Sequence, residues 1–134
     1  HDVTDEGPCN GESVDYPDIA AIVGRKISAS EIDRGILICG TGIGMAITAN
    51  KFPHVRAAVA NEVCLAKVCR EHNDANVICV SGDLPEVAAA RDSRLEELRQ
   101  ILSAFLTTAF EGGRHALRVD KISAVEEQVA KCCS

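Results

Sequence analysis

Short runs of apolar residues alternate along this chain with segments in which apolar residues recur at helical spacing. Each run is continuously apolar, which is typical of a strand buried on both faces of a sheet. Three such strands are predicted, at 35–39, 55–60 and 76–80. Strands that alternate with helices predict an α/β fold, a doubly wound, Rossmann-like three-layer α/β/α sandwich with a parallel sheet.

The helical segments lie before, between and after these strands. Predicted helices cover 17–27, 45–51, 62–71, 85–110 and about 119–130, and residues 1–5 could form a further short strand. Asn73 suits the left-handed position after a helix, and Gly112 and Gly113 end the long helix. Since a domain usually has ~100–200 residues, the 134 residues predict a single domain, 1–134.

Composition supports this fold and excludes some functions. Aromatic residues make up only 3% of the chain, so Ile, Val, Leu and Ala must build the core, which suits a helix-covered parallel sheet better than a β-sandwich. The 20 acidic and 14 basic residues give a formal net charge of -6, which disfavours nucleic-acid and membrane-surface binding. With no apolar run of ~20 residues and no signal peptide, a cytoplasmic protein is expected.

The chain has seven cysteines, an odd number. No pair forms a CxxC motif, and no Cys/His set has zinc spacing, so no metal site is predicted. Four of them (Cys39, Cys64, Cys69 and Cys79) lie in apolar stretches and are expected to be buried thiols in a reducing compartment. Cys132 and Cys133 are interpreted as an exposed tail pair, and a redox function is disfavoured.

One cysteine stands at a chemically special place. Cys39 is the last residue of a predicted strand, and the turn Gly40–Gly44 follows it and opens a helix. Backbone N–H groups of such a turn form a cradle for an anion, and they favour the thiolate form of a nearby cysteine. Tight strand-to-helix packing and an inert thiol are the structural alternatives. The spacing fits neither a dinucleotide fingerprint nor a P-loop.

Two further groups offer polar chemistry. His72, between a helix and a buried strand, could exchange a proton near neutral pH, or it could only cap helix carbonyls. Arg114 and Arg118 lie four residues apart on one helical face and could clamp a phosphate, or they could form a solvated basic helix start. Together with Cys39 they suggest acid–base chemistry on a small phosphorylated substrate.

Six motifs of the chain resemble the ribose-5-phosphate isomerase B family, which includes the galactose-6-phosphate isomerase subunits. They occur in the family's order, and the resemblance extends from near residue 1 to about residue 127. The motifs are Ser13-Val-Asp-Tyr-Pro17, Gly35-Ile-Leu-Ile-Cys-Gly-Thr-Gly-Ile-Gly-Met45, Ala49-Asn-Lys51, Arg56-Ala-Ala58, Glu71-His-Asn-Asp-Ala-Asn76 and Glu111-Gly-Gly-Arg-His115.

The resemblance implies an aldose–ketose isomerase that interconverts ribose 5-phosphate and ribulose 5-phosphate without a metal or organic cofactor. Cys39 matches the catalytic base and His72 the acid that opens the sugar ring. The residues implied to bind the enediolate, the sugar and its phosphate are Gly40, Thr41, Gly42, Ile43, Gly44, Asn73, Arg114, Arg118 and Tyr16. Family members are dimers or tetramers, in which the His-Asn segment and the arginines reach the partner's cysteine.

The chain also departs from the family pattern. The family opens with a βα unit that carries an Asp-His pair, and this unit is expected to be missing from the 134 residues. Ser81-Gly82-Asp83 stands where the family often has Gly-x-Arg. Arg91 or Arg94 could replace that cation. A 6-phosphohexose isomerase, acting on allose or galactose 6-phosphate, and a non-catalytic sugar-phosphate-binding subunit remain the alternative functions.

Overall fold

The computed structural model describes residues 1–8 and 10–132. Helices and strands alternate along the chain until two consecutive helices end it. In chain order the elements are α1 Tyr16–Ser28, β1 Gly35–Cys39, α2 Ile43–Ala49, β2 Ala57–Val59, α3 Val63–Asn73, β3 Val77–Ser81, α4 Ala88–Thr107 and α5 Arg114–Cys132. The α/β class and the three predicted strands are therefore confirmed.

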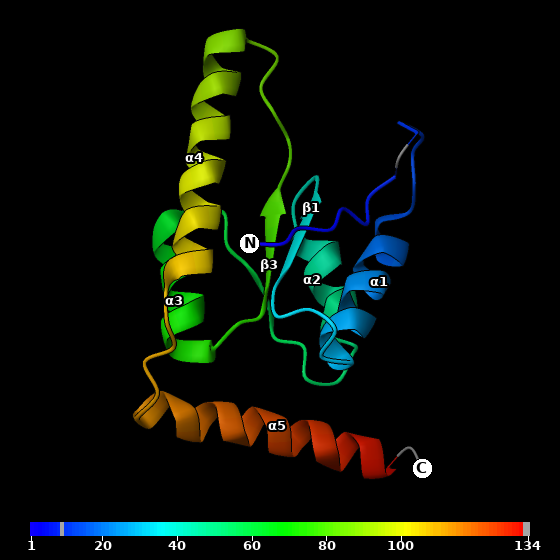
Figure 1. Ribbon diagram of the computed structural model, residues 1–134, viewed down its shortest axis with the longest axis vertical. Helices are drawn as coiled ribbons and strands as arrows, with labels where there is room; N and C mark the ends of the chain where they lie inside the picture. The colour runs from blue at the N-terminus through cyan, green and yellow to red at the C-terminus, as the bar shows by residue number, and fades with distance from the viewer. Residues whose placement is uncertain (9, 133–134) are drawn as a thin grey trace.

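The three strands form one parallel sheet in which β3 lies between β1 and β2. Gly35 pairs with Val77 where β1 and β3 begin, and Cys39 pairs with Ser81 where they end. Because the strands are parallel, their ends lie at one edge of the sheet, toward the top of Figure 1. We call it the carboxyl edge and the opposite one the amino edge.

Helices cover both faces of the sheet, α1 and α2 on one and α3 and α4 on the other (Figure 1). Each face has its own core, with Leu37 and Met45 in the first and Ile78 and Phe105 in the second. β3 contributes to both because successive side chains of a strand point to opposite faces. The arrangement is the predicted doubly wound sandwich.

The chain leaves β1 and β3 toward opposite faces of the sheet. α2 follows β1 on the face of the first core, whereas α4 follows β3 on the other face. In open parallel sheets, ligands bind at the carboxyl ends of neighbouring strands whose connections diverge in this way. The topology therefore places a candidate site at residues 39–44 and 81–83.

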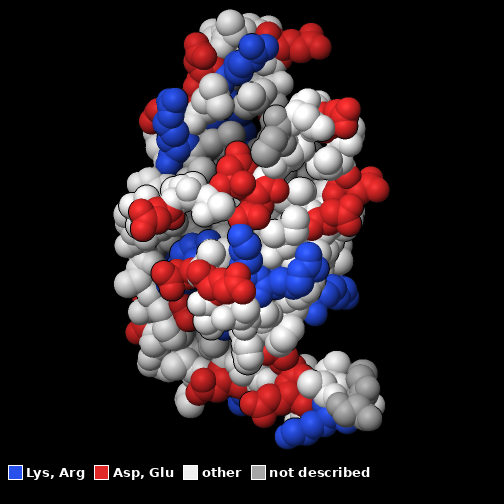
Figure 2. All heavy atoms as spheres, turned by 45° about the vertical axis from the view of Figure 1, so that its right-hand side comes forward, with Lys and Arg blue, Asp and Glu red and all other residues white. Residues whose placement is uncertain are grey.

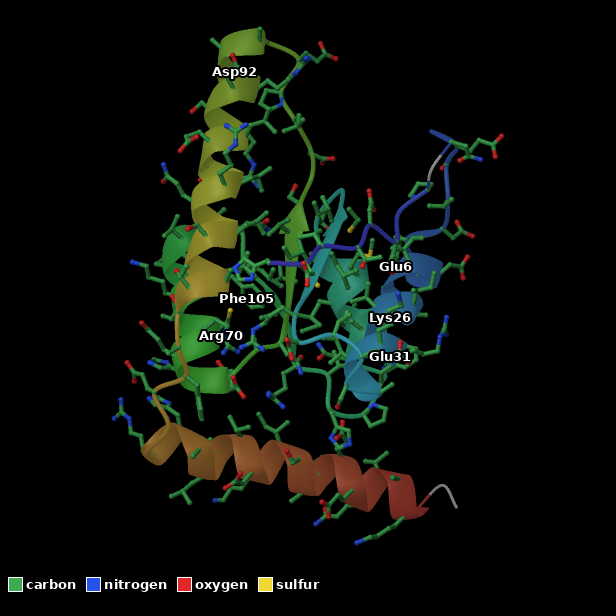
Figure 3. All side chains as sticks on the ribbon, in the orientation of Figure 1. Glu6, Lys26, Glu31, Arg70, Asp92 and Phe105 are labelled. Carbon is green, nitrogen blue, oxygen red and sulfur yellow. The ribbon has the colours of Figure 1, made fainter. Side chains whose placement is uncertain are left out.

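A buried arginine joins α3 to the end of α4. Arg70 is 3% exposed, and its guanidinium donates to the carbonyls of Ala75 at 2.6 Å and Thr108 at 3.3 Å. It also pairs with Asp74 at 2.7 Å and lies over the ring of Phe105, 5.9 Å from the centroid (Figure 3). Such a buried charge is tolerated because it is both paired and hydrogen-bonded.

The last helix, α5, lies along the amino edge, below the strands in Figure 1. Just before it, the Glu111 N–H donates to the Glu71 carbonyl of α3 at 3.1 Å. Farther along, the Glu126 carboxylate accepts the backbone N–H of His54 at 2.9 Å. These contacts attach α5 at two points. Several apolar side chains of α5 nevertheless stay 49–67% exposed, namely Leu117, Ile122, Val125 and Val129.

The bounds of two helices differ from the prediction by three residues or more. The last helix begins at Arg114 instead of near 119, directly after Gly112 and Gly113, whose φ angles of 66° and 55° turn the chain into it. The long helix covers Ala88–Thr107 of the predicted 85–110, because Thr108 is already extended.

Smaller corrections concern a cap and a strand. Asp74, not Asn73, takes the left-handed conformation after α3, with a φ of 46°. The strand predicted at 55–60 shortens to β2, Ala57–Val59, the part that pairs with β3.

The segment before α1 does not contain the short strand expected at residues 1–5. A strand needs the backbone groups of a neighbouring strand, whereas this segment is attached to α1 by a side-chain ion pair. Figure 3 shows the two partners, Glu6 and Lys26, side by side. Among the described residues β1 is an edge strand, and its Ile36 and Ile38 are 38% and 52% exposed.

The surroundings of the cysteines agree only in part with expectation. Cys69 and Cys79 are buried and Cys39 is half-buried, but Cys64 is exposed because it lies on the outer side of α3. Cys132 is exposed at the end of α5, and its expected tail partner, Cys133, lies outside the described residues.

No helix within residues 1–8 and 10–132 combines the length and the apolar character needed to cross a membrane. Figure 2 shows one face of the molecule, on which the Lys and Arg side chains lie among Asp and Glu side chains. That face therefore does not carry a broad field of one sign.

Candidate active site

Cys39 ends β1, and the glycine turn leads from it directly into α2. Gly42 caps α2 with a φ of 79°, a conformation that glycine adopts without strain. The Gly42 N–H points at the Cys39 sulfur at 3.1 Å, and the Ile43 N–H donates to the Thr41 hydroxyl oxygen at 3.3 Å. The half-buried thiol thus lies in a turn whose N–H groups can bind an anion.

Hydrogen bonds connect the loops that follow all three strands around this turn. The Ser81 hydroxyl donates to the Gly40 carbonyl at 2.6 Å, and the Ser81 N–H donates to the Asn61 side-chain oxygen at 2.6 Å. The Gly82 N–H donates to the Cys39 carbonyl at 2.8 Å. These bonds fix Cys39 and Gly40 relative to β2 and β3.

Two more side chains lie against the turn. A Cβ placed on Gly44 would come within 2.4 Å of the Tyr16 ring, so Tyr16 lies directly against the turn. A Cβ placed on Gly40 would lie 3.6 Å from a carboxylate oxygen of Asp83. Asp83 therefore brings a negative charge to this edge. The side chain of Arg94, one of the two expected replacement cations, reaches the same loop and donates to the Ser81 carbonyl at 3.3 Å.

The other predicted residues lie at the amino edge. His72 is in the last turn of α3, and its ring stacks on that of His115 in α5, with centroids 4.1 Å apart and planes 6° apart. His115 is 4% exposed, and its Nε2 lies 3.5 Å from a carboxylate oxygen of Glu111. The imidazole of His72 is therefore held by the start of α5.

The two arginines begin α5 beside this pair of rings. Arg114 and Arg118 are exposed, and their spacing places them on one side of the helix. The Arg114 Nε donates to the His115 Nε2 at 3.4 Å. Asn73 is also exposed, and it immediately follows His72. The structure thus gathers His72, Asn73 and the arginines at one edge.

The Cys39 group and the His72 group lie at opposite edges of the sheet (Figure 1). β1 and β3 each have five residues, and at about 3.3 Å per residue they separate the two edges by about 13 Å. An acid or base must lie about 3 Å from the atom it serves. Within the described part of one chain, Cys39 and His72 therefore cannot act together on one small substrate.

Sequence reasoning did not single out Asn61, Asp83 or His115 as site residues. Asn61 and Asp83 could have been found from their places just after predicted strands, where polar side chains collect at a carboxyl edge. For the contact of His115 with His72 no local signal exists, since it depends on how α5 packs on α3.

The environment of His115 makes stability depend on pH. Burial lowers the pKa of His115 below its usual 6.5, His72 and Arg114 lower it further, and Glu111 opposes them. The unfolded chain therefore binds this proton at a higher pH than the native protein does. We expect the free energy of unfolding to fall as the pH decreases through 6.5 and to level off once native His115 is protonated.

Urea unfolding at a series of pH values, from neutral to about pH 5, measures this effect. His115→Gln should reduce the slope of the unfolding free energy against pH, whatever it does to absolute stability. A variant with the slope of the wild type would contradict the assignment.

A thiol in a turn of backbone donors, an imidazole and paired guanidinium groups are the parts of an acid–base enzyme for a phosphorylated substrate. Comparison of the sequence with known proteins points to the same class of enzyme. A model of the family described as Ribose/Galactose Isomerase matches residues 1–122. Ribose-5-phosphate isomerase B of Escherichia coli is 41% identical over 127 residues, which cover 95% of this chain and 80% of the relative.

Solved structures show the same relationship. Ribose-5-phosphate isomerase B of Clostridium thermocellum superposes with a TM-score of 0.85 at 41% identity, over 96% of this chain and 82% of the other. The Mycoplasma genitalium enzyme with bound ribulose-5-phosphate gives a TM-score of 0.77 at 41% identity, over 91% and 76%. The chain belongs to the ribose/galactose isomerase family. The family expected from the motifs is thus confirmed.

Proposed function

We propose that this chain is a ribose-5-phosphate isomerase that interconverts ribose 5-phosphate and ribulose 5-phosphate through an enediolate. The observation that carries the proposal is the Cys39 thiol at the backbone cradle of residues 40–44. It occurs in a fold shared over most of the chain with proteins named ribose-5-phosphate isomerase B. A cytoplasmic location remains a prediction.

Cys39 is the proposed base of the isomerisation. Its thiolate removes the proton from C2 of the open-chain aldose and returns it to C1, while a hydroxyl proton passes from O2 to O1. Negative charge develops on the oxygens of the enediolate between these steps. The N–H groups of Gly40, Gly42, Ile43 and Gly44, with the Thr41 hydroxyl, are suited to stabilise that charge because backbone donors need no reorganisation.

The residues of the amino edge complete the proposed chemistry. His72 donates a proton to the ring oxygen and so opens the furanose, and Asn73 contacts the sugar. Arg114 and Arg118 bind the phosphate, which anchors the substrate at a fixed distance from the base. Tyr16 lines the pocket beside Gly44. This scheme requires neither a metal nor an organic cofactor.

Each active site would then be made from two copies of the chain. Cys39 and His72 lie about 13 Å or more apart within one chain, so a second copy must supply the His72 side of the site. The exposed apolar side chains of α5 support self-association, because a row of such groups is usually covered. A dimer or tetramer with shared sites satisfies both observations.

An isomerase assay of the purified chain tests the function. Cys39→Ala is expected to lower kcat on ribose 5-phosphate by about 10²–10⁴-fold, the usual contribution of a general base. Cys64→Ala, which removes an exposed thiol of α3, is the matched control and should leave kcat unchanged. A Cys39→Ala protein with wild-type kcat would exclude this base.

The same assay separates the alternatives. We expect kcat/KM to be higher for ribose 5-phosphate than for allose 6-phosphate or galactose 6-phosphate. The reverse order would assign the chain to 6-phosphohexoses. Binding of the sugar phosphates without any turnover would identify a non-catalytic subunit.

A further inference from the structure

Three metal-ligating side chains meet where α3 contacts the start of α5. His72, Glu111 and His115 each offer one ligand atom, and these atoms all lie within 4.8 Å of one another. Two imidazoles and one carboxylate form a donor set that suits Zn²⁺ and neighbouring transition metals. We propose that these three side chains bind a divalent transition-metal ion, with a fourth position left for water.

The two imidazole rings must rotate out of their stacked arrangement to share an ion. The rings of His72 and His115 are almost parallel, so their nitrogen lone pairs run side by side. Rotation about the broad terminal torsion of each imidazole turns the lone pairs toward a common point. Glu111 is 53% exposed on its side chain, so its carboxylate can approach the ion without disturbing the core.

The start of α5 places two cationic side chains beside the proposed ligands. The Arg114 Nε donates to the His115 Nε2 at 3.4 Å, so the Arg114 side chain must turn away before that nitrogen can bind an ion. Arg114 and Arg118 repel a cation, but both are exposed and can turn into solvent.

An ion at this position would occupy His72. This consequence rests on the proposed function, in which His72 opens the sugar ring. A bound metal is therefore expected to inhibit the isomerase, and a chelator is expected to restore it. The ion takes no part in the reaction itself.

Titration of the full 134-residue chain with Co²⁺, followed by absorption spectroscopy, tests the site independently of activity. We expect the d–d bands of a four-coordinate cobalt ion without the thiolate-to-metal charge-transfer band that cysteine ligands produce. Glu111→Gln is expected to weaken Co²⁺ binding by about tenfold or more. The matched control is His54→Gln, which alters another His–Glu contact, 3.5 Å from Glu126, and should leave binding unchanged.

The outcomes separate binding from inhibition. Equal Co²⁺ affinity of the wild type and Glu111→Gln, or a spectrum dominated by thiolate charge transfer, would overturn the site. His72→Gln gives a second test, since it removes a half-buried ligand without opening the core. Zn²⁺ that displaces Co²⁺ but leaves turnover unchanged would overturn the inhibition alone. A chain without isomerase activity would refute the proposed function, and the cobalt spectra would still decide the metal site.

Discussion

Mixing Cys39→Ala protein with His72→Asn protein is expected to restore isomerase activity that neither variant has alone. In a hybrid dimer, one of the two sites combines the intact Cys39 of one chain with the intact His72 of the other. Random pairing makes half of the dimers hybrids, so activity should recover to about a quarter of the wild-type rate. The measurement is turnover of ribose 5-phosphate after the two chains have been unfolded and refolded together.

The control replaces one partner with the double variant Cys39→Ala/His72→Asn. No pairing of this chain with Cys39→Ala protein contains an intact Cys39, so its mixture should stay inactive. If the first mixture also stayed inactive although hybrid dimers had formed, the shared site would be refuted. Full activity of either single variant would instead remove that residue from the chemistry.

Truncation of Phe105 is expected to cause the largest loss of stability. Phe105 is fully buried in the core between β3, α3 and α4, and the Arg70 guanidinium lies over its ring. Phe105→Ala leaves a cavity in this core and removes the aromatic ring that packs against the buried Arg70 guanidinium. We expect the free energy of unfolding to fall by about 3–5 kcal/mol, as measured by urea denaturation at fixed protein concentration.

Val87→Ala is the matched control, because Val87 precedes α4 and is 68% exposed. Its effect should stay within about 0.5 kcal/mol. A loss below about 1 kcal/mol for Phe105→Ala would mean that the core collapses around the missing ring.

The strands and the thiol at the carboxyl edge could be predicted because burial leaves a local mark on the sequence. The apolar runs at 35–39 and 76–80 correspond to β1 and to β3, Val77–Ser81. β3 is continuously apolar because helices cover both of its faces, whereas β1 is buried on one face and leaves Ile36 and Ile38 exposed on the other. The place of Cys39 followed from the same pattern, since a glycine turn marks where the strand ends.

The amino edge could not be predicted in the same way. The stacking of His72 on His115 depends on the direction in which α5 leaves the loop at Gly112 and Gly113. Two positive φ angles in succession set that direction, and no periodic pattern encodes them. The resemblance to the family named His72 and the arginines, but their neighbours Glu111 and His115 emerge only from the packing of two helices.

The N–H groups around Cys39 belong to the main chain, so they persist whichever side chains Thr41 and Ile43 carry. Gly42 is different, because a Cβ there would lie 3.1 Å from the carbonyl carbon and oxygen of Cys79 and from the Val80 nitrogen. Those backbone atoms belong to the central strand β3, and they cannot move without disturbing its hydrogen bonds to β1 and β2. Substitution of the exposed Thr41 or Ile43 therefore leaves these main-chain donors in place, whereas even a single methyl group at Gly42 would push the turn away from the central strand.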